Sequence, residues 1–352
     1  MRVAIDISQI VYGTGVSQYT KNLVKALLKL DREDEFLLFA GALRRKSDVL
    51  NLFPQTKIFP IPPILADFVW NRLHILPIEK LIGQADLIHT SDWAEPPSTS
   101  PKVTTIHDLY ALKFPRMINK EVREAHERRL RWVFQESKKI IVPSESTRED
   151  LLELGVAKER IRVIPEAPTH SKVGESAIAA VKLKYGVKGN YLMTIGASPL
   201  KNTTRIIKAF HLSSAGRDLK LILAGLPTGV EIPQERNIRA LDFVPAEDMG
   251  ALLTGSQGLI FASIYEGYGI PILDAFNCGV PVVTSNTASM PEVAGNAAAL
   301  VDPHDVNLIA DGIEKILRGP KGFIEKGLER VKEFSWEKTA KETLAIYKEV
   351  GR

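Results

Sequence analysis

The 352-residue chain contains one cysteine, Cys278, so an internal disulfide is excluded. No apolar run approaches the roughly 18 residues that a membrane-spanning helix needs. The chain starts directly in a strand pattern and lacks the basic and apolar segments of a signal peptide. These absences predict a cytoplasmic protein. The net charge of +4 is too small to indicate nucleic-acid binding, and no repeat of solenoid period is present.

What the chain does contain is an alternation of short apolar runs with helical patterns, within a globular composition of 45% hydrophobic and 25% charged residues. Such runs are typical of strands buried in a parallel sheet. A proline-containing segment at 165–170 separates two series. We therefore predict two doubly wound α/β domains. The expected strands lie at 2–6, 35–40, 85–90, 102–108 and 139–144 in the first series, and at 191–196, 219–225 and 258–263 in the second.

Charge is concentrated in one expected helix, at 119–139. Between Lys113 and Lys139 there are nine Lys or Arg against four Glu. This is either a solvated face or a surface for an anionic acceptor or membrane. The segment 60–77 has proline and aromatic character, and it either packs internally or contacts the acceptor or a membrane. Ser146 and Glu149 predict a capping box for the next helix, which ends near Gly155.

The run SIYEGYGIPILDAFNCGVPVV, residues 263–283, carries the strongest functional signal. Its first residues follow an expected strand, and Gly267 and Gly269 allow a close backbone approach to a ligand. Pro271 and Gly279 predict a helix over 271–278, whose N-terminus suits an anion. Glu266 and Asp274 suit hydroxyl groups instead of phosphate. Together these features predict a ligand with phosphates between two polyols, such as a nucleotide sugar.

The same run resembles the nucleotide-sugar signature of the family 4 retaining glycosyltransferases. Other pieces agree in order along the chain: GTGVSQYTKNL, TIHDL, TIGASPLKN, SMPEVAGNAAALVDP and FSWEKTA. The resemblance implies the GT-B fold, with two Rossmann-like domains facing a cleft. It places an acceptor-side domain at 1–167 and a nucleotide-sugar domain at 168–335, with the helix 336–352 packing back on the first.

The resemblance also implies roles for residues of this run. Glu266 matches the acid that contacts hydroxyls of the donor sugar. The backbone of Gly267, Tyr268, Gly269 and Ile270 is expected to face the diphosphate and sugar. Asp274 matches the acid that holds the ribose, where the family usually has Glu, so its reach is shorter by about 1.5 Å.

Residues outside the run complete the expected site. Lys201 matches the lysine that neutralises the leaving diphosphate, and Arg205 is expected to help because Leu200 and Ala197 stand where the family often has arginine. His107, beside Asp108, matches the histidine over the donor sugar. The expected catalytic residues are therefore Glu266, His107 and Lys201. Gly13 and Gly15 match loop glycines that approach the phosphates or the acceptor.

The resemblance implies transfer of a sugar from a nucleoside diphosphate, with GDP-mannose favoured, to a glycan or lipid-linked acceptor, and with retention. The sequence has no Asp-x-Asp and no clustered metal ligands, so we predict no metal and no other cofactor. We expect no nucleic-acid partner, and a peripheral contact of the first domain with the inner face of a membrane. The alternatives are a non-catalytic nucleotide-sugar binding protein, an epimerase and a phosphorylase; no pattern supports the pyridoxal-phosphate site of a phosphorylase.

Overall fold

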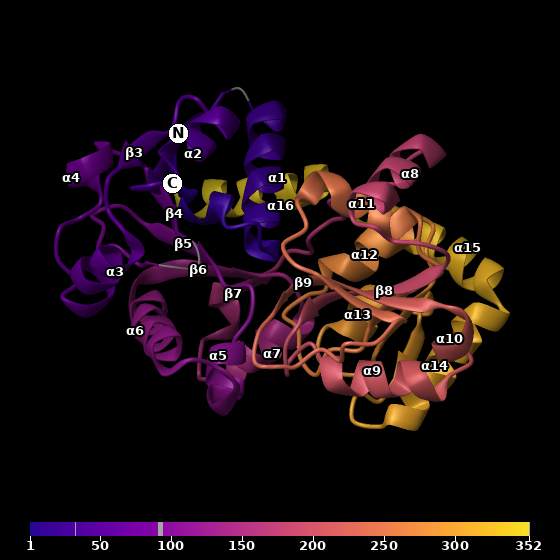
Figure 1. The fold of residues 1–352 in the computed structure, drawn as a ribbon. Coiled ribbons are helices and arrows are strands. Elements are labelled where there is room, and N and C mark those ends of the chain that lie inside the picture. Colours follow the sequence, from indigo (N-terminus) through magenta and orange to yellow (C-terminus); the bar gives the residue numbers. More distant parts are fainter. Residues whose placement is uncertain (32, 91–93, 352) are drawn as a thin grey trace. The chain divides into compact units, whose positions relative to one another are not determined.

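The computed structural model describes residues 1–31, 33–90 and 94–351. The chain forms two compact units, coloured by sequence in Figure 1. The first comprises Met1–Glu166 with Ser335–Arg352, and the second comprises Ala167–Phe334. Each unit has its own sheet and its own buried core.

The first unit is built on a seven-stranded sheet of order β3-β2-β1-β4-β5-β6-β7, and every pairing in it is parallel. The central strands are buried on both faces, which explains their unbroken apolar runs. Because the order reverses between β1 and β4, the carboxyl ends of these strands mark the expected ligand edge. The strands are β1 (Arg2–Asp6), β2 (Glu35–Gly41), β3 (Lys57–Phe59), β4 (Leu87–Thr90), β5 (Lys102–Thr105), β6 (Ser137–Val142) and β7 (Ile161–Val163).

Helices connect these strands. The helices of the first unit are α1 (Gly15–Leu30), α2 (Lys46–Leu52), α3 (Pro63–Ala66), α4 (Glu79–Ile82), α5 (Tyr110–Lys113), α6 (Lys120–Glu136), α7 (Glu145–Glu153) and α16 (Trp336–Val350). A π-helix, η2 (Asp67–Arg72), continues α3, and 3-10 turns lie at η1 (Ser8–Val11), η3 (Pro115–Met117) and η4 (Lys158–Arg160).

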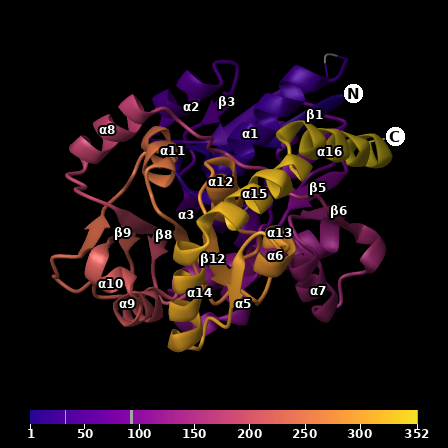
Figure 2. The same ribbon diagram turned by 90° about the vertical axis from the view of Figure 1, so that its right-hand side faces the viewer.

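The C-terminal helix α16 lies beside α1 in both views (Figure 1, Figure 2). Its Tyr347 is fully buried, and the Tyr347 hydroxyl lies 2.5 Å from Nδ1 of His89 on β4. Trp336, at the start of α16, meets the ring of Tyr19 edge-on at a centroid distance of 5.9 Å. The last helix is therefore part of the core of the first unit.

The second unit repeats the design with a six-stranded parallel sheet of order β10-β9-β8-β11-β12-β13. Its reversal lies between β8 and β11, which pair directly. The strands are β8 (Tyr191–Ala197), β9 (Lys220–Pro227), β10 (Ile238–Leu241), β11 (Leu259–Phe261), β12 (Val282–Ser285) and β13 (Ala299–Val301). The helices are α8 (Glu175–Lys184), α9 (Thr203–Leu212), α10 (Ala215–Asp218), α11 (Ala246–Thr254), α12 (Ile270–Asn277), α13 (Met290–Ala294), α14 (Val306–Arg318), α15 (Pro320–Arg330) and the 3-10 turn η5 (Val331–Glu333).

The capping box predicted at Ser146 and Glu149 is wrong. Helix α7 begins two residues earlier than that box implies, because Ser144 is its N-cap and accepts a hydrogen bond from the Thr147 backbone N–H. Ser144 stands at the end of the apolar run of β6, where a strand leads directly into a helix. Among the described residues, no helix has the length and apolar character needed to cross a bilayer.

Candidate active site

Two charged side chains follow the two strands at the reversal of the second sheet. Lys201 lies in the turn after β8, and Glu266 lies in the loop after β11. The Lys201 Nζ lies 2.6 Å from the Glu266 Oε1, and the side chains are 32% and 16% exposed. Ligands of doubly wound sheets bind beyond the strand ends at such a reversal. The fold thus brings the two predicted residues together at the expected ligand position.

The path of the Lys201 side chain depends on a glycine at the end of β8. Gly196 has a φ of +80°, and a Cβ added there would lie 3.1 Å from Cγ and 3.2 Å from Cε of Lys201. The Lys201 ammonium also lies 5.1 Å from the centre of the Phe261 ring, a distance suited to a cation–π contact. Gly196 therefore makes room for the lysine stem and directs its charge toward Glu266.

The loop that carries Glu266 is tied to its neighbours through its backbone. The Ile264 N–H donates to the Leu200 carbonyl at 2.9 Å. The buried Ser289 hydroxyl lies 2.9 Å from the carbonyl of Glu266 and 2.5 Å from that of Tyr268. These bonds fix the loop between the lysine turn and α13. Glu266 is thus held by the backbone, and its carboxylate stays available to exchange partners.

The start of α12 lies directly after this loop. Gly269 precedes the helix with a φ of +121°, a conformation that side chains rarely adopt. The residues Gly267 to Ile270 are buried. The helix runs one residue earlier at each end than the predicted range 271–278. Its N-terminus carries the partial positive charge of the helix dipole, which suits an anion beside Gly269.

Asp274 occupies a different environment from the one its predicted role suggests. It is 4% exposed, and its Oδ1 accepts hydrogen bonds from the backbone N–H groups of Thr169 at 2.5 Å and His170 at 2.8 Å. Its Oδ2 accepts from the Thr169 hydroxyl at 3.0 Å. Burial raises the pKa of this carboxyl group above its usual value. Both oxygens thus hold the segment that enters the second unit, and ribose binding by Asp274 stays a prediction.

Arg205 lies in the first turn of α9, where its Nη1 donates to the Asn202 side-chain oxygen at 3.1 Å. The Asn202 amide nitrogen donates in turn to the carbonyls of Ala262 at 2.9 Å and Pro303 at 2.6 Å. Asn202 has a φ of 59° and is the N-cap residue of α9. Arg205 therefore braces the turn that presents Lys201. Asn202 was not predicted, although it follows Lys201 directly in SPLKN.

His107 lies just after β5 in the first unit. Its Nδ1 lies 3.0 Å from Oε1 of Glu166, and both side chains are buried. The Tyr19 ring meets the imidazole edge-on, with centroids 4.6 Å apart and an interplanar angle of 80°. These contacts fix the orientation of the imidazole. Glu166 was not predicted from the sequence, although it is an acid that follows Pro165 shortly after the end of β7.

The Gly13–Gly15 loop joins η1 to α1 and is exposed. Gly13 has a φ of 71°, so its backbone favours glycine. Gly15 is the first residue of α1, and a Cβ there would meet nothing within 4 Å. Thr14 caps α1 in a reciprocal capping box with Ser17. Gly13 therefore has the backbone conformation that favours glycine, and Gly15 has open space around it. Both features are compatible with the predicted close approach of this loop to the phosphates or the acceptor.

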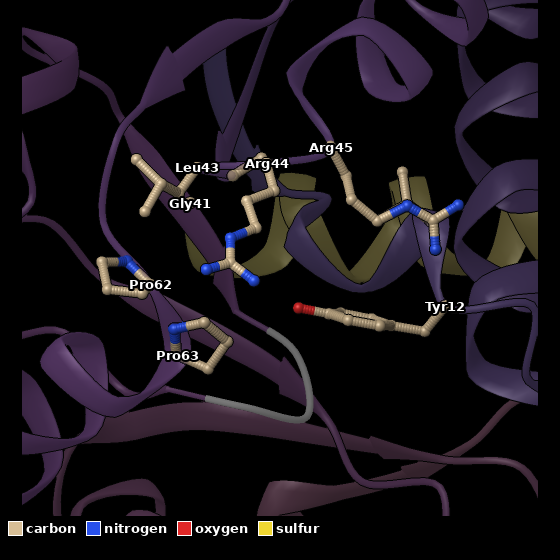
Figure 3. A pocket seen from close by; sticks show the side chains of 9 residues that line it. Tyr12, Gly41, Leu43, Arg44, Arg45, Pro62 and Pro63 are labelled. Atoms are coloured by element: carbon tan, nitrogen blue, oxygen red, sulfur yellow. The ribbon is translucent and has the colours of Figure 1, made fainter.

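A pocket of about 290 Å³ lies at the carboxyl ends of β1 and β2 in the first unit (Figure 3). The Tyr12 hydroxyl and the Arg44 guanidinium point into the same space, beside the rings of Pro62 and Pro63. Arg45 also lines the pocket and pairs with Asp48 at 2.7 Å on the surface. Tyr12, Arg44 and Arg45 were not predicted, although the LRRK run just after the second strand contains both arginines, whereas Pro62 and Pro63 belong to the segment 60–77 already named for the acceptor or a membrane.

Each unit matches a glycosyltransferase family model. The model described as Glycosyltransferase Family 4 matches residues 13–167, and the model described as Glycosyl transferases group 1 matches residues 181–334. The chain is 29% identical to O-antigen chain mannosyltransferase B of Escherichia coli over 95% of this chain and 96% of that protein. It is 27% identical to MMP alpha-(1->4)-mannosyltransferase of Mycolicibacterium hassiacum, over 59% of this chain and 53% of that protein.

Solved structures give the same fold. Sucrose-phosphate synthase from Thermosynechococcus elongatus has a TM-score of 0.74 at 18% identity, over 99% of this chain and 98% of that one. HepE from Anabaena, in complex with UDP and glucose, has a TM-score of 0.73 at 16% identity, over 99% of this chain and 100% of that one. The predicted α/β architecture of GT-B type, with two Rossmann-like domains, is confirmed. The chain belongs to the group 1, family 4 glycosyltransferases and resembles their mannosyltransferase members.

Proposed function

We propose that the enzyme transfers mannose from GDP-mannose, with retention, to a hydroxyl group of a glycan or lipid-linked acceptor. The observation that carries the proposal is the Lys201–Glu266 pair beside the N-terminus of α12. An ammonium group and helix N–H groups suit a diphosphate, whereas a carboxylate suits sugar hydroxyls. Support for mannose comes from the mannosyltransferase relatives.

In the proposed reaction, Lys201 turns from Glu266 to the diphosphate when the donor binds. The bond between the anomeric carbon and the phosphate oxygen breaks, and the acceptor oxygen bonds to the same face of that carbon. The acceptor proton passes to the leaving phosphate oxygen. Lys201 and the N–H groups at the start of α12 stabilise the negative charge of the leaving diphosphate, and such electrostatic stabilisation is commonly the largest contribution to catalysis.

Other predicted residues take supporting roles in the proposal. The backbone of Gly267–Ile270 faces the diphosphate and sugar, and Glu266, once released by Lys201, accepts hydrogen bonds from sugar hydroxyls. His107, held by Glu166, contributes a contact to the donor sugar. The Gly13–Gly15 loop is proposed to approach the phosphates or the acceptor.

We propose that the reaction needs no metal ion, because Lys201 and α12 supply positive charge where Mg²⁺ or Mn²⁺ does so in other transferases. The sequence has no Asp-x-Asp. Transfer is expected to proceed unchanged in EDTA. Loss of transfer in EDTA, with recovery on adding Mg²⁺ or Mn²⁺, would contradict this part of the proposal.

The pocket of Tyr12, Arg44 and Arg45 is proposed to bind the acceptor. The Tyr12 ring and the two prolines offer apolar surface to a sugar face, and a guanidinium group donates paired hydrogen bonds to hydroxyl or anionic oxygens. Arg44→Ala is expected to raise the KM for the acceptor about tenfold, on the scale of one charged hydrogen bond, without changing the donor KM. The neighbouring exposed Lys46→Ala is the control. An unchanged acceptor KM in Arg44→Ala would contradict binding of the acceptor in this pocket.

The direct test is incubation with GDP-mannose, UDP-glucose or ADP-glucose, with and without a mannose-terminated glycan. The proposal predicts release of GDP together with a product that keeps the α configuration of the donor, detected by NMR of the anomeric proton. A β-linked product would contradict retention. An isomerised sugar nucleotide formed without acceptor would indicate an epimerase, and binding without turnover would indicate a non-catalytic protein.

A further inference from the structure

The segment formed by α3, η2 and the loop that follows exposes its large apolar side chains. Ile64 is 86% exposed, Leu65 and Phe68 follow it at helical spacing, and the remaining residues lie where η2 ends and in the loop after it. The exposed apolar residues of this segment are Ile64, Leu65, Phe68, Leu73, Ile75 and Leu76. Met117 and Val122, near the start of α6, are exposed as well, and η2 packs against α6. We call these eight side chains the apolar surface.

Two residues of the same segment, one aromatic and one polar, face inward. Trp70 and Asn71 are buried. The Trp70 indole N–H donates to the Leu76 carbonyl at 3.1 Å, and the Trp132 indole N–H on α6 donates to the Asn71 carbonyl at 2.8 Å. The prediction that segment 60–77 packs internally therefore holds for these side chains and not for the apolar surface. Aliphatic side chains face solvent while an amide is enclosed, which is the reverse of an ordinary surface helix.

The loop that ends the segment is held rigidly. His74 has a φ of 52° and stacks on Trp132 with centroids 3.5 Å apart. Its Nε2 lies 2.7 Å from a carboxylate oxygen of Glu136. Leu76 has a φ of 64°, although it is not glycine. A non-glycine residue keeps such a conformation when its surroundings fix it, so the exposure of Ile75 and Leu76 is built into the fold.

A groove of about 420 Å³ lies between α3 and α6, the helices labelled in Figure 1. Its apolar walls come from Pro63, Ile64, Val122 and Ala125. Among the charged residues that line it, Arg128 and Asp67 pair at 2.6 Å, whereas Glu121 is exposed. The apolar walls of the groove therefore extend the apolar surface.

Cations border the apolar surface. Arg72 lies within it, Arg116 precedes Met117, and Arg131 lies farther along α6. All three are exposed, and within residues 1–31, 33–90 and 94–351 none of them forms an ion pair. The exposed acid beside Val122 is Glu121. Unpaired arginines around exposed aliphatic and aromatic side chains match the interface of a bilayer with anionic headgroups, where the apolar side chains insert and the guanidinium groups meet the headgroups.

We propose that the apolar surface docks the first unit onto a bilayer that contains anionic lipids. The positive border favours such a bilayer over an apolar face of another protein, which would leave the arginines without counter-charges. The inference rests on the proposed function only for its purpose, which is to bring the enzyme to a lipid-linked acceptor. Docking itself requires neither donor nor acceptor.

The test is co-sedimentation of the full chain with vesicles of phosphatidylglycerol and phosphatidylethanolamine, and with vesicles of phosphatidylcholine alone, without nucleotide. We expect binding to the anionic vesicles that weakens with added salt. The double variant Ile64→Glu, Phe68→Glu is expected to bind at least about tenfold more weakly, since two apolar groups are replaced by charges that anionic headgroups repel. The matched control is Leu183→Glu, Leu212→Glu, whose leucines are 84% and 63% exposed in the second unit.

A second double variant tests the electrostatic contribution to vesicle binding. Arg72→Glu with Arg116→Glu is expected to weaken binding to anionic vesicles by at least about tenfold, because each cation near an anionic surface contributes roughly 1 kcal/mol. Equal binding of the Ile64/Phe68 variant and the control would overturn the proposal. So would a failure of the wild-type chain to bind anionic vesicles, or a dimer that the Ile64/Phe68 variant abolishes. Nucleotide binding by the same variants reports on the second unit, so failure of docking and failure of the proposed transfer are distinguishable.

Discussion

The Lys201 ammonium and the Glu266 carboxylate lie 2.6 Å apart, although one follows β8 and the other follows β11, 65 residues later. Each neutralises the other at the reversal of the second sheet. A diphosphate offers an ammonium group more negative charge than one carboxylate does, so donor binding is expected to separate the pair. The two residues then have different tasks, and substitutions separate those tasks.

Glu266→Ala is expected to lower kcat by at least about 100-fold, the scale of losing one electrostatic contact in the transition state. The affinity for the free nucleoside diphosphate is expected to stay equal or to rise, because Lys201 no longer has a competing partner. Initial rates of sugar transfer and titration calorimetry with the nucleotide measure the two effects. Glu247→Ala, at an exposed glutamate on α11, is the control. Near wild-type turnover in Glu266→Ala would show that Glu266 is not needed for catalysis.

Gly196→Ala tests whether the glycine directs Lys201. The added Cβ would lie 3.1 Å from Lys201 Cγ, so the lysine stem has to move and transfer is expected to fall by at least about tenfold. Gly189→Ala is the matched control, because Gly189 has a similar φ of +78° but open space around its Cβ. Both variants carry the same backbone strain, of about 1–3 kcal/mol. If both lose activity equally, the strain alone matters and the steric argument fails.

The site could largely be predicted from the sequence, because most of its residues lie in one short and recognisable sequence pattern. Glu266, the two following glycines and the helix start lie within a few residues, and their spacing predicted α12 to within one residue at each end. The contact between Lys201 and Glu266 could be seen only in the structure, because no local sequence pattern shows that the ends of β8 and β11 lie side by side. The resemblance assigned both residues, but it did not indicate that they pair in the absence of a ligand.

Tertiary contacts decide what local patterns leave open. Asp274 fits the spacing of a ribose-binding acid, and that role stays a prediction; its hydrogen bonds from the backbone N–H groups of Thr169 and His170 could not be predicted from the sequence. The four edge strands β3, β7, β10 and β13 were not predicted, because their residues are only partly buried and do not form the continuous apolar runs of central strands. The sequence also did not predict that the apolar residues near Ile64 are exposed, because apolar spacing alone does not show which side of a helix faces the core.

Asp274→Ala is expected to destabilise the second unit by about 2–4 kcal/mol, because two buried backbone N–H groups lose their acceptor. Asp274→Asn keeps an acceptor oxygen and is expected to recover most of this loss. Calorimetric unfolding of the second unit measures both variants. A stable Asp274→Ala enzyme with a strongly raised nucleotide Kd would instead favour ribose binding by Asp274.

Asp6 is expected to make the first unit less stable as the pH rises from about 4 to 7. Burial raises the pKa of Asp6 from 3.8 to about 6. In this interval the folded state retains a proton that the unfolded state has lost, so stability decreases with rising pH, by on the order of 3 kcal/mol in total. Asp6→Asn removes this titration and leaves an acceptor for the Ser8 hydroxyl.

The quantity to measure is the difference in unfolding free energy between wild type and Asp6→Asn at each pH, in which the titration of all other groups cancels. The variant is expected to gain stability relative to wild type as the pH rises through 6. A difference that stays constant from pH 4 to pH 7 would mean that Asp6 ionises normally in the folded protein.

The central claim is that Lys201 binds the diphosphate of a nucleotide sugar. Titration calorimetry of wild type, Lys201→Ala and the exposed Lys208→Ala with GDP, UDP and ADP tests it without any acceptor. We expect one nucleoside diphosphate, with GDP favoured, to bind wild type and Lys208→Ala alike. Lys201→Ala is expected to bind it at least about tenfold more weakly, because a charged hydrogen bond is lost. Equal affinity of Lys201→Ala and wild type, or no binding of any of the three nucleotides, would contradict the claim.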